Sequence, residues 1–286
     1  MNPLDLLWLY FMLSSLTPLL QQKMLAYQRV QSLRALEKRN RSRAITLIHR
    51  REGFAFLGIP FGGYIDIDDS EAVIRAVETA TSDQAIDMVL HTPGGLVLAA
   101  EQIAAALANH PGHVTVYVPH YAMSGGTLIA LAADRIVMSP SAVLGPVDPQ
   151  LGEYAAASIL AAVAQKDVNE VDDKTLILAD VSRKAQTQVR DFVTELLSRH
   201  NPDHEAVREL ATTLSEGRWT HDFPINAQHA TKLGLPVDTD LPEEVRKLMS
   251  LYPQARGRRP SVEYIPTETE PAPRGQRPRS TNGSRN

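Results

Sequence analysis

HTPGGLVLAAEQIAAALANHPGHVTVYVPHYAMSGGTLIALAADRIVMSPSAVLGPVDPQLG, residues 91–152, is the stretch that decides the fold. Apolar runs at residues 85–90 and 114–118, in or just before it, are typical of buried parallel strands. Each run is followed by a glycine pair and an alanine-rich helix, expected at residues 96–108 and 127–133. Two strand–turn–helix units in series predict an α/β domain whose helices cross over between parallel strands.

The second glycine pair comes directly after Ser124, in the sequence AMSGG. A serine on a tight strand-to-helix turn has its hydroxyl lifted off the sheet, as in a nucleophile elbow, although the sequence here is not G-x-S-x-G. Because glycine has no Cβ, Gly94 and Gly95 can bring backbone N–H groups close to a substrate. With the N–H of Gly125, these groups could hold a developing oxyanion. Tight turns alone would also account for each glycine pair, since a lone pair is a weak signal.

Three segments resemble the serine dehydrogenase proteinase family, whose relatives are signal peptide peptidase A and the Clp proteolytic subunit. They are HTPGGLVLAAEQIA, PHYAMSGGTLIALAADRIVMSPSAVLGPVDPQLG and GRWTHDFPINAQHATKLGLPV, and the resemblance runs from residue 45 to 237. It implies a Clp/crotonase-like α/β fold of repeated β-β-α units. It also implies a serine endopeptidase of the Ser-Lys dyad type with Ser124 as nucleophile, an oxyanion hole from Gly94, Gly95 and Gly125, and assembly into a homo-oligomer.

A serine hydroxyl needs a neighbouring base to take its proton. In signal-peptide-peptidase-like relatives this base is a lysine ahead of a long helix. Matching that helix to residues 176–199 implies Lys166 as the base, with Lys174 as second choice and a histidine as a third possibility. His91 and His120 lie near the two glycine pairs, but no histidine lies between His120 and His200, which counts against a Clp-type Ser-His-Asp triad.

Composition narrows the function classes. The 286 residues suffice for one sizeable α/β domain with appendages, and a net charge of −4 gives no overall basic character that would point to nucleic acid. The absence of cysteine excludes disulfides, a cysteine nucleophile and cysteine-based zinc sites. Acidic residues at positions 66–71 lack the pattern of an EF-hand, so we attribute them to helix capping. We expect neither a cofactor nor a metal.

The N-terminal segment predicts membrane association. Residues 4–20, LDLLWLYFMLSSLTPLL, approach the length of about 20 apolar residues that a spanning helix needs, with Pro18 near the end, where a helix break costs least. We expect an uncleaved anchor there; a helix lying in the membrane interface or packed on a partner subunit is the alternative. The basic flank that follows would place the catalytic domain in the cytoplasm by the positive-inside rule.

The chain therefore divides into an anchor with a basic helix (1–43), a peptidase domain (44–251) and a Pro/Arg-rich tail expected to be disordered (252–286). The expected substrate is a peptide or protein, with membrane-protein fragments among the candidates. Two other functions share the fold: crotonase-type acyl-CoA chemistry and a non-catalytic membrane scaffold. The remaining expected elements are strands at 44–49, 54–59, 135–138 and 142–144, and helices at 72–81, 155–166, 176–199, 202–214, 227–233 and 241–251.

Overall fold

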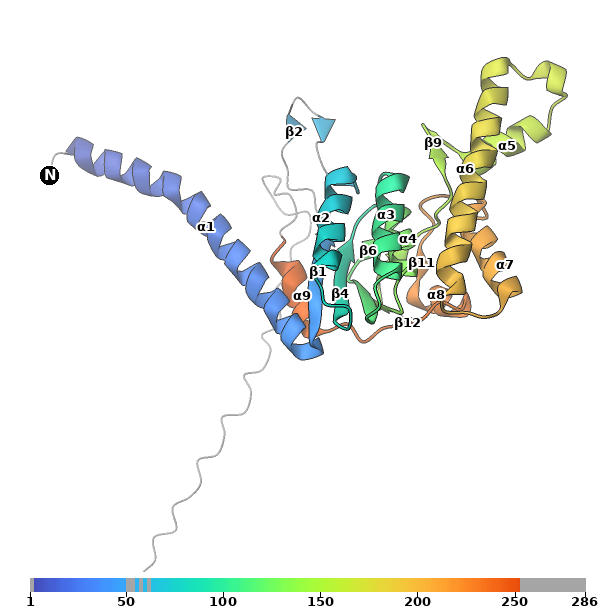
Figure 1. The fold of residues 1–286 in the computed structure, drawn as a ribbon. Helices are drawn as coiled ribbons and strands as arrows, with labels where there is room; N and C mark the ends of the chain where they lie inside the picture. Colours follow the sequence, from blue (N-terminus) through green and yellow to red (C-terminus); the bar gives the residue numbers. More distant parts are fainter. Residues whose placement is uncertain (1–2, 50–54, 57–58, 61–62, 253–286) are drawn as a thin grey trace, which may run out of the picture. The chain divides into compact units, whose positions relative to one another are not determined.

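A parallel sheet organises the chain (Figure 1). The computed structural model describes residues 3–49, 55–56, 59–60 and 63–252, so residues 253–286 of the predicted tail and half of the predicted strand at 54–59 lie outside the described residues. Five strands pair in the order β1-β4-β5-β7-β12, all parallel. Their bounds are β1 (Ser42–Ile48), β4 (Ala85–His91), β5 (Val114–Val118), β7 (Arg135–Met138) and β12 (Val237–Asp238). The predicted α/β class with crossover helices is confirmed.

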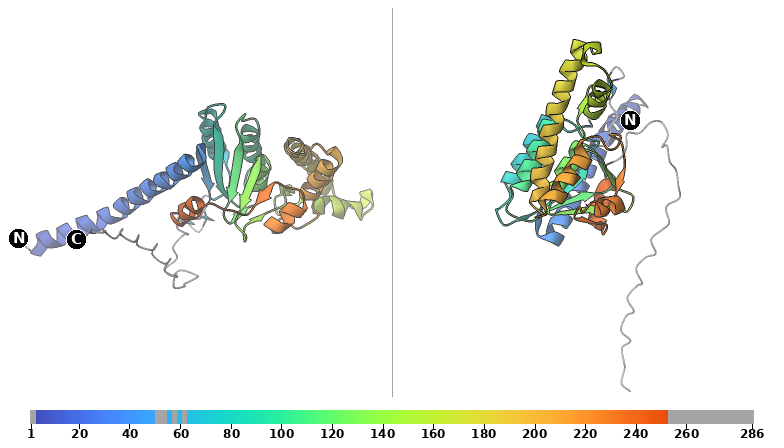
Figure 2. Two further views of the ribbon diagram at one scale, coloured as in Figure 1. Left: turned by 90° about the horizontal axis from the view of Figure 1, so that it is seen from below. Right: turned by 90° about the vertical axis from the view of Figure 1, so that its right-hand side faces the viewer.

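Helices cover both faces of this sheet, as the left view of Figure 2 shows. Met88 and Leu90 of β4 belong to the core shared with α2 (Ile67–Glu78), α3 (Val97–Ala108) and α4 (Gly125–Leu131). Val89 belongs to a second core, formed with the end of α1 (Pro3–Asn40) and with α9 (Glu243–Ser250). Burial on both faces explains why β4 and β5 are continuous apolar runs rather than alternating ones.

The remaining elements extend this core. They are β2 (Ala55–Phe56), β3 (Ile59–Pro60), β6 (Tyr121–Ala122), β8 (Val143–Leu144), β9 (Gln150–Leu151), β10 (Tyr154–Ala155), α5 (Ala156–Ala164), a 3₁₀ turn (Val168–Glu170), α6 (Asp173–Ser198), α7 (His204–Ser215), β11 (Ile225–Asn226) and α8 (Ala227–Lys232).

The helix predicted at 72–81 instead begins at Ile67. Asp66 and Asp69 form a reciprocal capping box there, which starts the helix five residues earlier and confirms a capping role for the acidic cluster.

The N-terminal helix differs from the prediction. α1 continues through Pro18 and beyond residue 20, where the predicted hydrophobic segment ends, so the anchor segment and the basic helix are one helix. In the part of the chain that the structure describes, no helix is long and apolar enough to cross a membrane. Farther along, Leu33 and Leu36 pack on the second core. Met24 and Tyr27 are exposed, so only the last turns of α1 are packed on the domain.

A buried polar cluster fixes the end of α1 to the sheet. The Asn40 amide donates to Asp87 Oδ2 at 2.7 Å and to the Tyr117 hydroxyl at 2.9 Å. Ser42 Oγ donates to the same carboxylate at 2.5 Å, and the Tyr117 hydroxyl donates to Asp87 Oδ1 at 3.2 Å. Because the Asp87 side chain is buried, these bonds replace the water that its charge would otherwise need.

A small sheet positions the chain beside α4. β8 pairs parallel with β6 and antiparallel with β11. Thr127 of α4, fully buried, joins this sheet to the helix: its hydroxyl lies 2.8 Å from Ala122 O and 2.9 Å from Gly145 O, and it accepts the Gly145 N–H at 3.0 Å. The residues on either side of Ser124 are therefore tied to the loop that follows β8.

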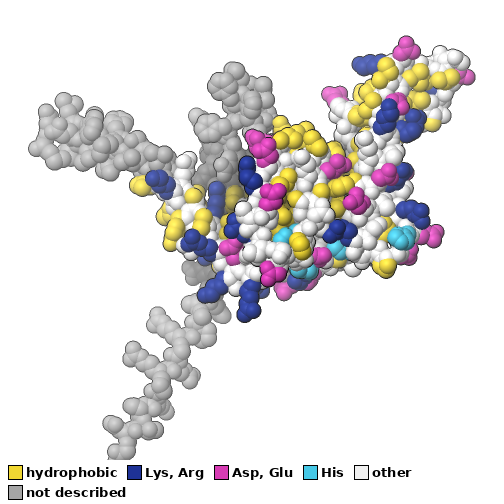
Figure 3. Space-filling view, viewed as in Figure 1, with side chains coloured by type: hydrophobic (Ala, Val, Ile, Leu, Met, Phe, Trp, Pro, Cys, Tyr) yellow, Lys and Arg dark blue, Asp and Glu magenta, His cyan; other side chains and the backbone are white. Residues whose placement is uncertain are grey.

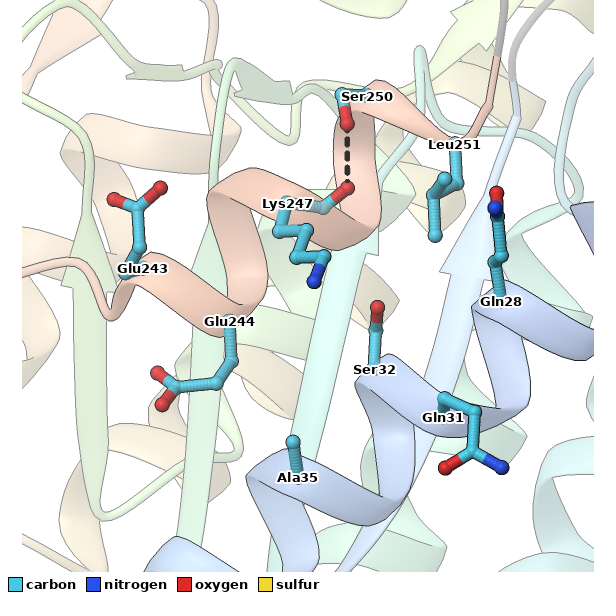
Figure 4. A pocket seen from close by; sticks show the side chains of 9 residues that line it. All are labelled: Gln28, Gln31, Ser32, Ala35, Glu243, Glu244, Lys247, Ser250 and Leu251. Carbon is cyan, nitrogen blue, oxygen red and sulfur yellow. Dashed lines mark hydrogen bonds between the residues drawn. The ribbon is translucent and has the colours of Figure 1, made fainter. Parts of the chain in front are cut away.

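A separate groove of about 540 Å³ lies between α1 and α9 (Figure 4). Polar side chains dominate its lining: Gln28, Gln31 and Ser32 come from α1, and Glu243, Glu244 and Lys247 come from α9. None of the residues predicted for catalysis lines it.

Candidate active site

Ser124 occupies a strained turn between β6 and α4. Its φ of 52° and ψ of −117° lie outside the regions that side chains normally adopt, and apart from Arg41 it is the only non-glycine residue with positive φ among the described residues. Such strain is costly and tends to persist at functional sites. The residue is half-buried at the N-terminus of α4, and its hydroxyl does not cap the helix. The predicted elbow geometry is therefore present.

Residues 92–95, which we call the oxyanion loop, pass directly beside this turn. Gly94 has a φ of +104°, and a Cβ built on it would lie 2.8 Å from Ser124 Cβ and 3.2 Å from Gly125 N. A Cβ on Gly125 would lie 3.7 Å from Gly95 N. The structure thus brings Gly94, Gly95 and Gly125 together around Ser124, and only glycine fits at Gly94.

Backbone hydrogen bonds aim the amides of this loop. Gly94 O accepts the Ile65 N–H at 2.8 Å. Since the C=O and N–H of one trans peptide point in opposite directions, this bond directs the Gly95 N–H away from Ile65. Gly125 is the first residue of α4, where N–H groups lack an intrahelical acceptor. Within the described residues, neither the Gly95 nor the Gly125 N–H donates a hydrogen bond, so both are available to an oxyanion.

The lysines lie elsewhere on the chain. Lys166 is exposed, two residues beyond the end of α5, and Lys174 is exposed in the first turn of α6. Among the described residues, neither forms a hydrogen bond or ion pair with Ser124. A single chain therefore does not complete the predicted Ser-Lys dyad, and the role of Lys166 stays a prediction.

Two histidine arrangements bear on the choice of base: His91 packs against His120, and His221 contacts a carboxylate. His91 is buried, with its ring 4.2 Å from that of Tyr121 and 5.4 Å from that of His120. The sequence analysis missed a pair: His221 Nδ1 lies 2.8 Å from an oxygen of Asp148, whose carboxylate is buried and also accepts from Gln150 Nε2 at 2.6 Å. The two partners are 73 positions apart, and no local spacing could have predicted their contact.

Apolar side chains surround the approach to the loop. Figure 3 shows hydrophobic side chains gathered over the ends of α2 and α3. The exposed ones are Tyr64, Ile67, Leu96, Val97 and Leu98, of which Leu98 is 60% exposed. Leu96 follows the oxyanion loop directly, so this surface adjoins Ser124 and could contact apolar segments of a substrate.

Fold and turn together define the class of protein: an α/β protein in which a serine hydroxyl lies beside two available backbone N–H groups, at the N-terminus of a helix. The chain belongs to the family of ClpP-like SDH-type serine proteinases, which it matches over residues 2–279. The resemblance found in the sequence is thereby confirmed.

The chain is also similar to individual proteins. Protein MJ0137 of Methanocaldococcus jannaschii is 53% identical over 259 residues, covering 91% of this chain and 90% of its own. The membrane protein NfeD1b of Bacillus subtilis is 32% identical over 136 residues, covering 46% of this chain and 28% of its own. Among solved structures, a membrane-bound stomatin-specific protease matches with a TM-score of 0.46 and 21% identity, over 71% of this chain and 82% of its own.

Proposed function

We propose that this chain is a membrane-associated serine endopeptidase that hydrolyses peptide bonds by acyl transfer through Ser124. The observation that carries the proposal is the position of Ser124 on a positive-φ turn beside the available N–H groups of Gly95 and Gly125. Membership of a serine proteinase family supports the same chemistry.

This site supplies the nucleophile and the oxyanion donors of the reaction, and a general base completes it. The Ser124 hydroxyl attacks the carbonyl carbon of the scissile peptide and gives its proton to a general base. The carbonyl oxygen becomes an oxyanion that accepts from Gly95 and Gly125 N–H. The C–N bond then breaks, and the amine leaves with the proton from the base. Water, deprotonated by the same base, hydrolyses the acyl-enzyme and regenerates Ser124.

The proposed base is Lys166, supplied by a second copy of the chain. Lys166 lies between α5 and α6, which form an arm whose outer end lies away from the sheet (Figure 1). This arm exposes Val168, Ile177 and Val181, of which Ile177 is 65% exposed. Packing of the arm on a second copy would cover these side chains and bury the lysine, and burial lowers the pKa of an amine into the range where it can act as a base. Lys174, on the same arm, remains the second choice.

One observation favours a histidine as the alternative base. Asp148 follows β8, Ser124 follows β6, and His221 precedes β11, whose strand runs antiparallel to β8. All three residues therefore lie at the same end of the strands of the small sheet. Asp148 orients the His221 ring as the acid of a catalytic triad would, with the second ring nitrogen left for a serine.

The test of the proposed function is hydrolysis of casein by the full chain. We expect Ser124→Ala to abolish it, because the acyl acceptor is lost, while thermal stability stays near that of the wild type. A fluorophosphonate probe is a weaker assay, since serine-lysine enzymes react sluggishly with it. Full casein hydrolysis by Ser124→Ala would refute the proposal.

Subunit mixing tests the base. We expect Lys166→Ala and Ser124→Ala to be inactive alone, and a mixture of refolded subunits to regain activity, because one interface then holds both intact residues. Lys174→Ala and His221→Ala serve as comparisons. If only His221→Ala removes activity, and Lys166→Ala retains it, the histidine is the base.

Membrane association would come from α1 lying on the bilayer rather than crossing it. Its exposed Leu20, Met24 and Tyr27 are accompanied by the basic and exposed Lys23. Apolar and basic side chains together suit the interface of an anionic membrane. Cosedimentation with phosphatidylglycerol vesicles should be lost when residues 1–30 are removed. The names of NfeD1b and of the stomatin-specific protease support a membrane setting. We propose membrane-protein fragments as substrates and a cytoplasmic location for the domain.

A further inference from the structure

We propose that His49, oriented by Asp69, is a positioning residue that holds the oxyanion loop in its working conformation through the Thr92 hydroxyl. The inference rests on the proposed function only in calling residues 92–95 an oxyanion loop. Its physical content is a chain of hydrogen bonds from the start of α2 to the Gly94 amide.

The contacts run through three elements. Asp69, in the first turn of α2, places Oδ2 at 3.1 Å from His49 Nε2. His49, directly after β1, places Nδ1 at 2.8 Å from Thr92 Oγ1. Thr92, directly after β4, accepts the Gly94 N–H at 3.1 Å. Thr92 is fully buried and the His49 side chain is 12% exposed, so water does not readily replace these bonds.

The partners fix the direction of each proton. A carboxylate only accepts, so His49 Nε2 carries a hydrogen and donates it to Asp69. For the neutral ring, Nδ1 is then an acceptor. The Thr92 hydroxyl donates to it at 2.8 Å, a shorter contact than the 3.4 Å to its other acceptor, Gly94 O. With its proton directed at His49, Thr92 Oγ1 presents its lone pairs to the Gly94 N–H. Asp69 thus sets the tautomer of His49, and the ring sets the direction of the hydroxyl.

This direction matters because Gly94 is held on both sides. Thr92 holds its N–H, and the Ile65 N–H holds its C=O. The second of these bonds aims the Gly95 N–H, and the first keeps the peptide before it from rotating. A glycine with a φ of +104° has no side chain to restrict it, so the restriction must come from such bonds.

Variants of His49 separate positioning from simple packing. In His49→Asn the amide lies near the place of Nδ1 and can reach Thr92. In His49→Gln the amide lies near the place of Nε2 and can reach only Asp69. We expect hydrogen exchange of the Gly94 amide, measured with residue resolution in the full chain, to be about tenfold faster in His49→Gln than in His49→Asn. Equal exchange in the two variants, or wild-type exchange in both, would overturn the proposal.

Thr92 variants and a distant histidine complete the set. Thr92→Val removes the acceptor of the Gly94 N–H at nearly constant volume, so hydrogen exchange of the Gly94 amide should be faster in this variant. Thr92→Ser keeps the hydroxyl and should keep an exchange rate near that of the wild type. His113 also lies beside a carboxylate, Asp134, but on an exposed strand end, and His113→Ala should leave Gly94 unaffected. Thr92→Ser with the exchange rate of Thr92→Val would contradict the inference.

Kinetics provide the functional measurement. A loosened oxyanion loop weakens a contact made in the transition state, so kcat should fall about tenfold to hundredfold in His49→Gln with KM nearly unchanged. A rise in KM with kcat intact would refute positioning of the amides. If the wild type shows no Ser124-dependent hydrolysis at all, the proposed function fails, and the exchange of Gly94 alone decides the inference.

Discussion

Replacing Gly94 by alanine tests the site most directly, because the structure specifies what the added methyl group meets. It would lie 2.8 Å from Ser124 Cβ, 2.9 Å from Met123 O and 3.2 Å from Gly125 N. Two of these neighbours are backbone atoms, and all three belong to the strained turn. The turn or the loop must therefore shift.

The expected loss of stability in Gly94→Ala has two contributions. Positive φ costs an alanine roughly 1–2 kcal/mol, and the close contacts add about 1–3 kcal/mol. We expect the free energy of unfolding to fall by about 2–5 kcal/mol. Gly234→Ala is the matched control, because its φ of +86° carries a similar backbone cost but its methyl group meets nothing within 4 Å. The control should lose only the first part.

Urea unfolding and casein hydrolysis measure the two consequences. Displacement of the Gly95 or Gly125 N–H should lower kcat by about 100-fold or more, as loss of one oxyanion donor does in other enzymes. Gly234→Ala should keep near-wild-type kcat under conditions where it is folded. If Gly94→Ala is as stable as Gly234→Ala and equally active, the described proximity of the loop to Ser124 is wrong.

Two further predictions concern buried polar groups. Thr127→Val leaves the Gly145 N–H without its acceptor and should lower the free energy of unfolding by about 2 kcal/mol in urea titrations; an unchanged midpoint would show that another group replaces the hydroxyl. Burial and the neighbouring Asp87 raise the pKa of the Tyr117 hydroxyl, so its stabilising contribution is complete below the unfolded pKa of about 10 and is lost as pH rises above it. Tyr117→Phe should reduce this alkaline loss of stability; an identical pH dependence would exclude Tyr117 as its source.

Sequence reasoning predicted the central sheet well because buried parallel strands leave a strong local signal. β4 and β5 are continuous apolar runs, and the glycine pairs mark the turns that follow them. The two-residue strands β6, β9 and β11 were missed, since their pairing depends on distant partners rather than on composition. The start of α2 was misplaced because Asp69 or Ser70 was taken as its cap, whereas Asp66 caps the helix and Asp69 completes the capping box.

The same distinction between local signals and distant contacts applies to the active site. Ser124 and the glycines around it could be predicted, because a tight turn and a close approach of two backbones require those residue types. The pairing of His221 with Asp148 could not, nor could the link from His49 to Thr92, because side chains from separate elements meet only after folding. The base remains a prediction, since Lys166 and Ser124 are not in contact within one chain.

The buried polar cluster at the end of α1 links this helix to the strand that leads to the active site. Asp87, near the start of β4, is bonded to Asn40, the last residue of α1, and the same strand ends at His91, immediately before the oxyanion loop. The end of α1 and the oxyanion loop are therefore attached to opposite ends of one strand, so a variant that displaces Asn40 should also change hydrogen exchange at the Gly94 amide.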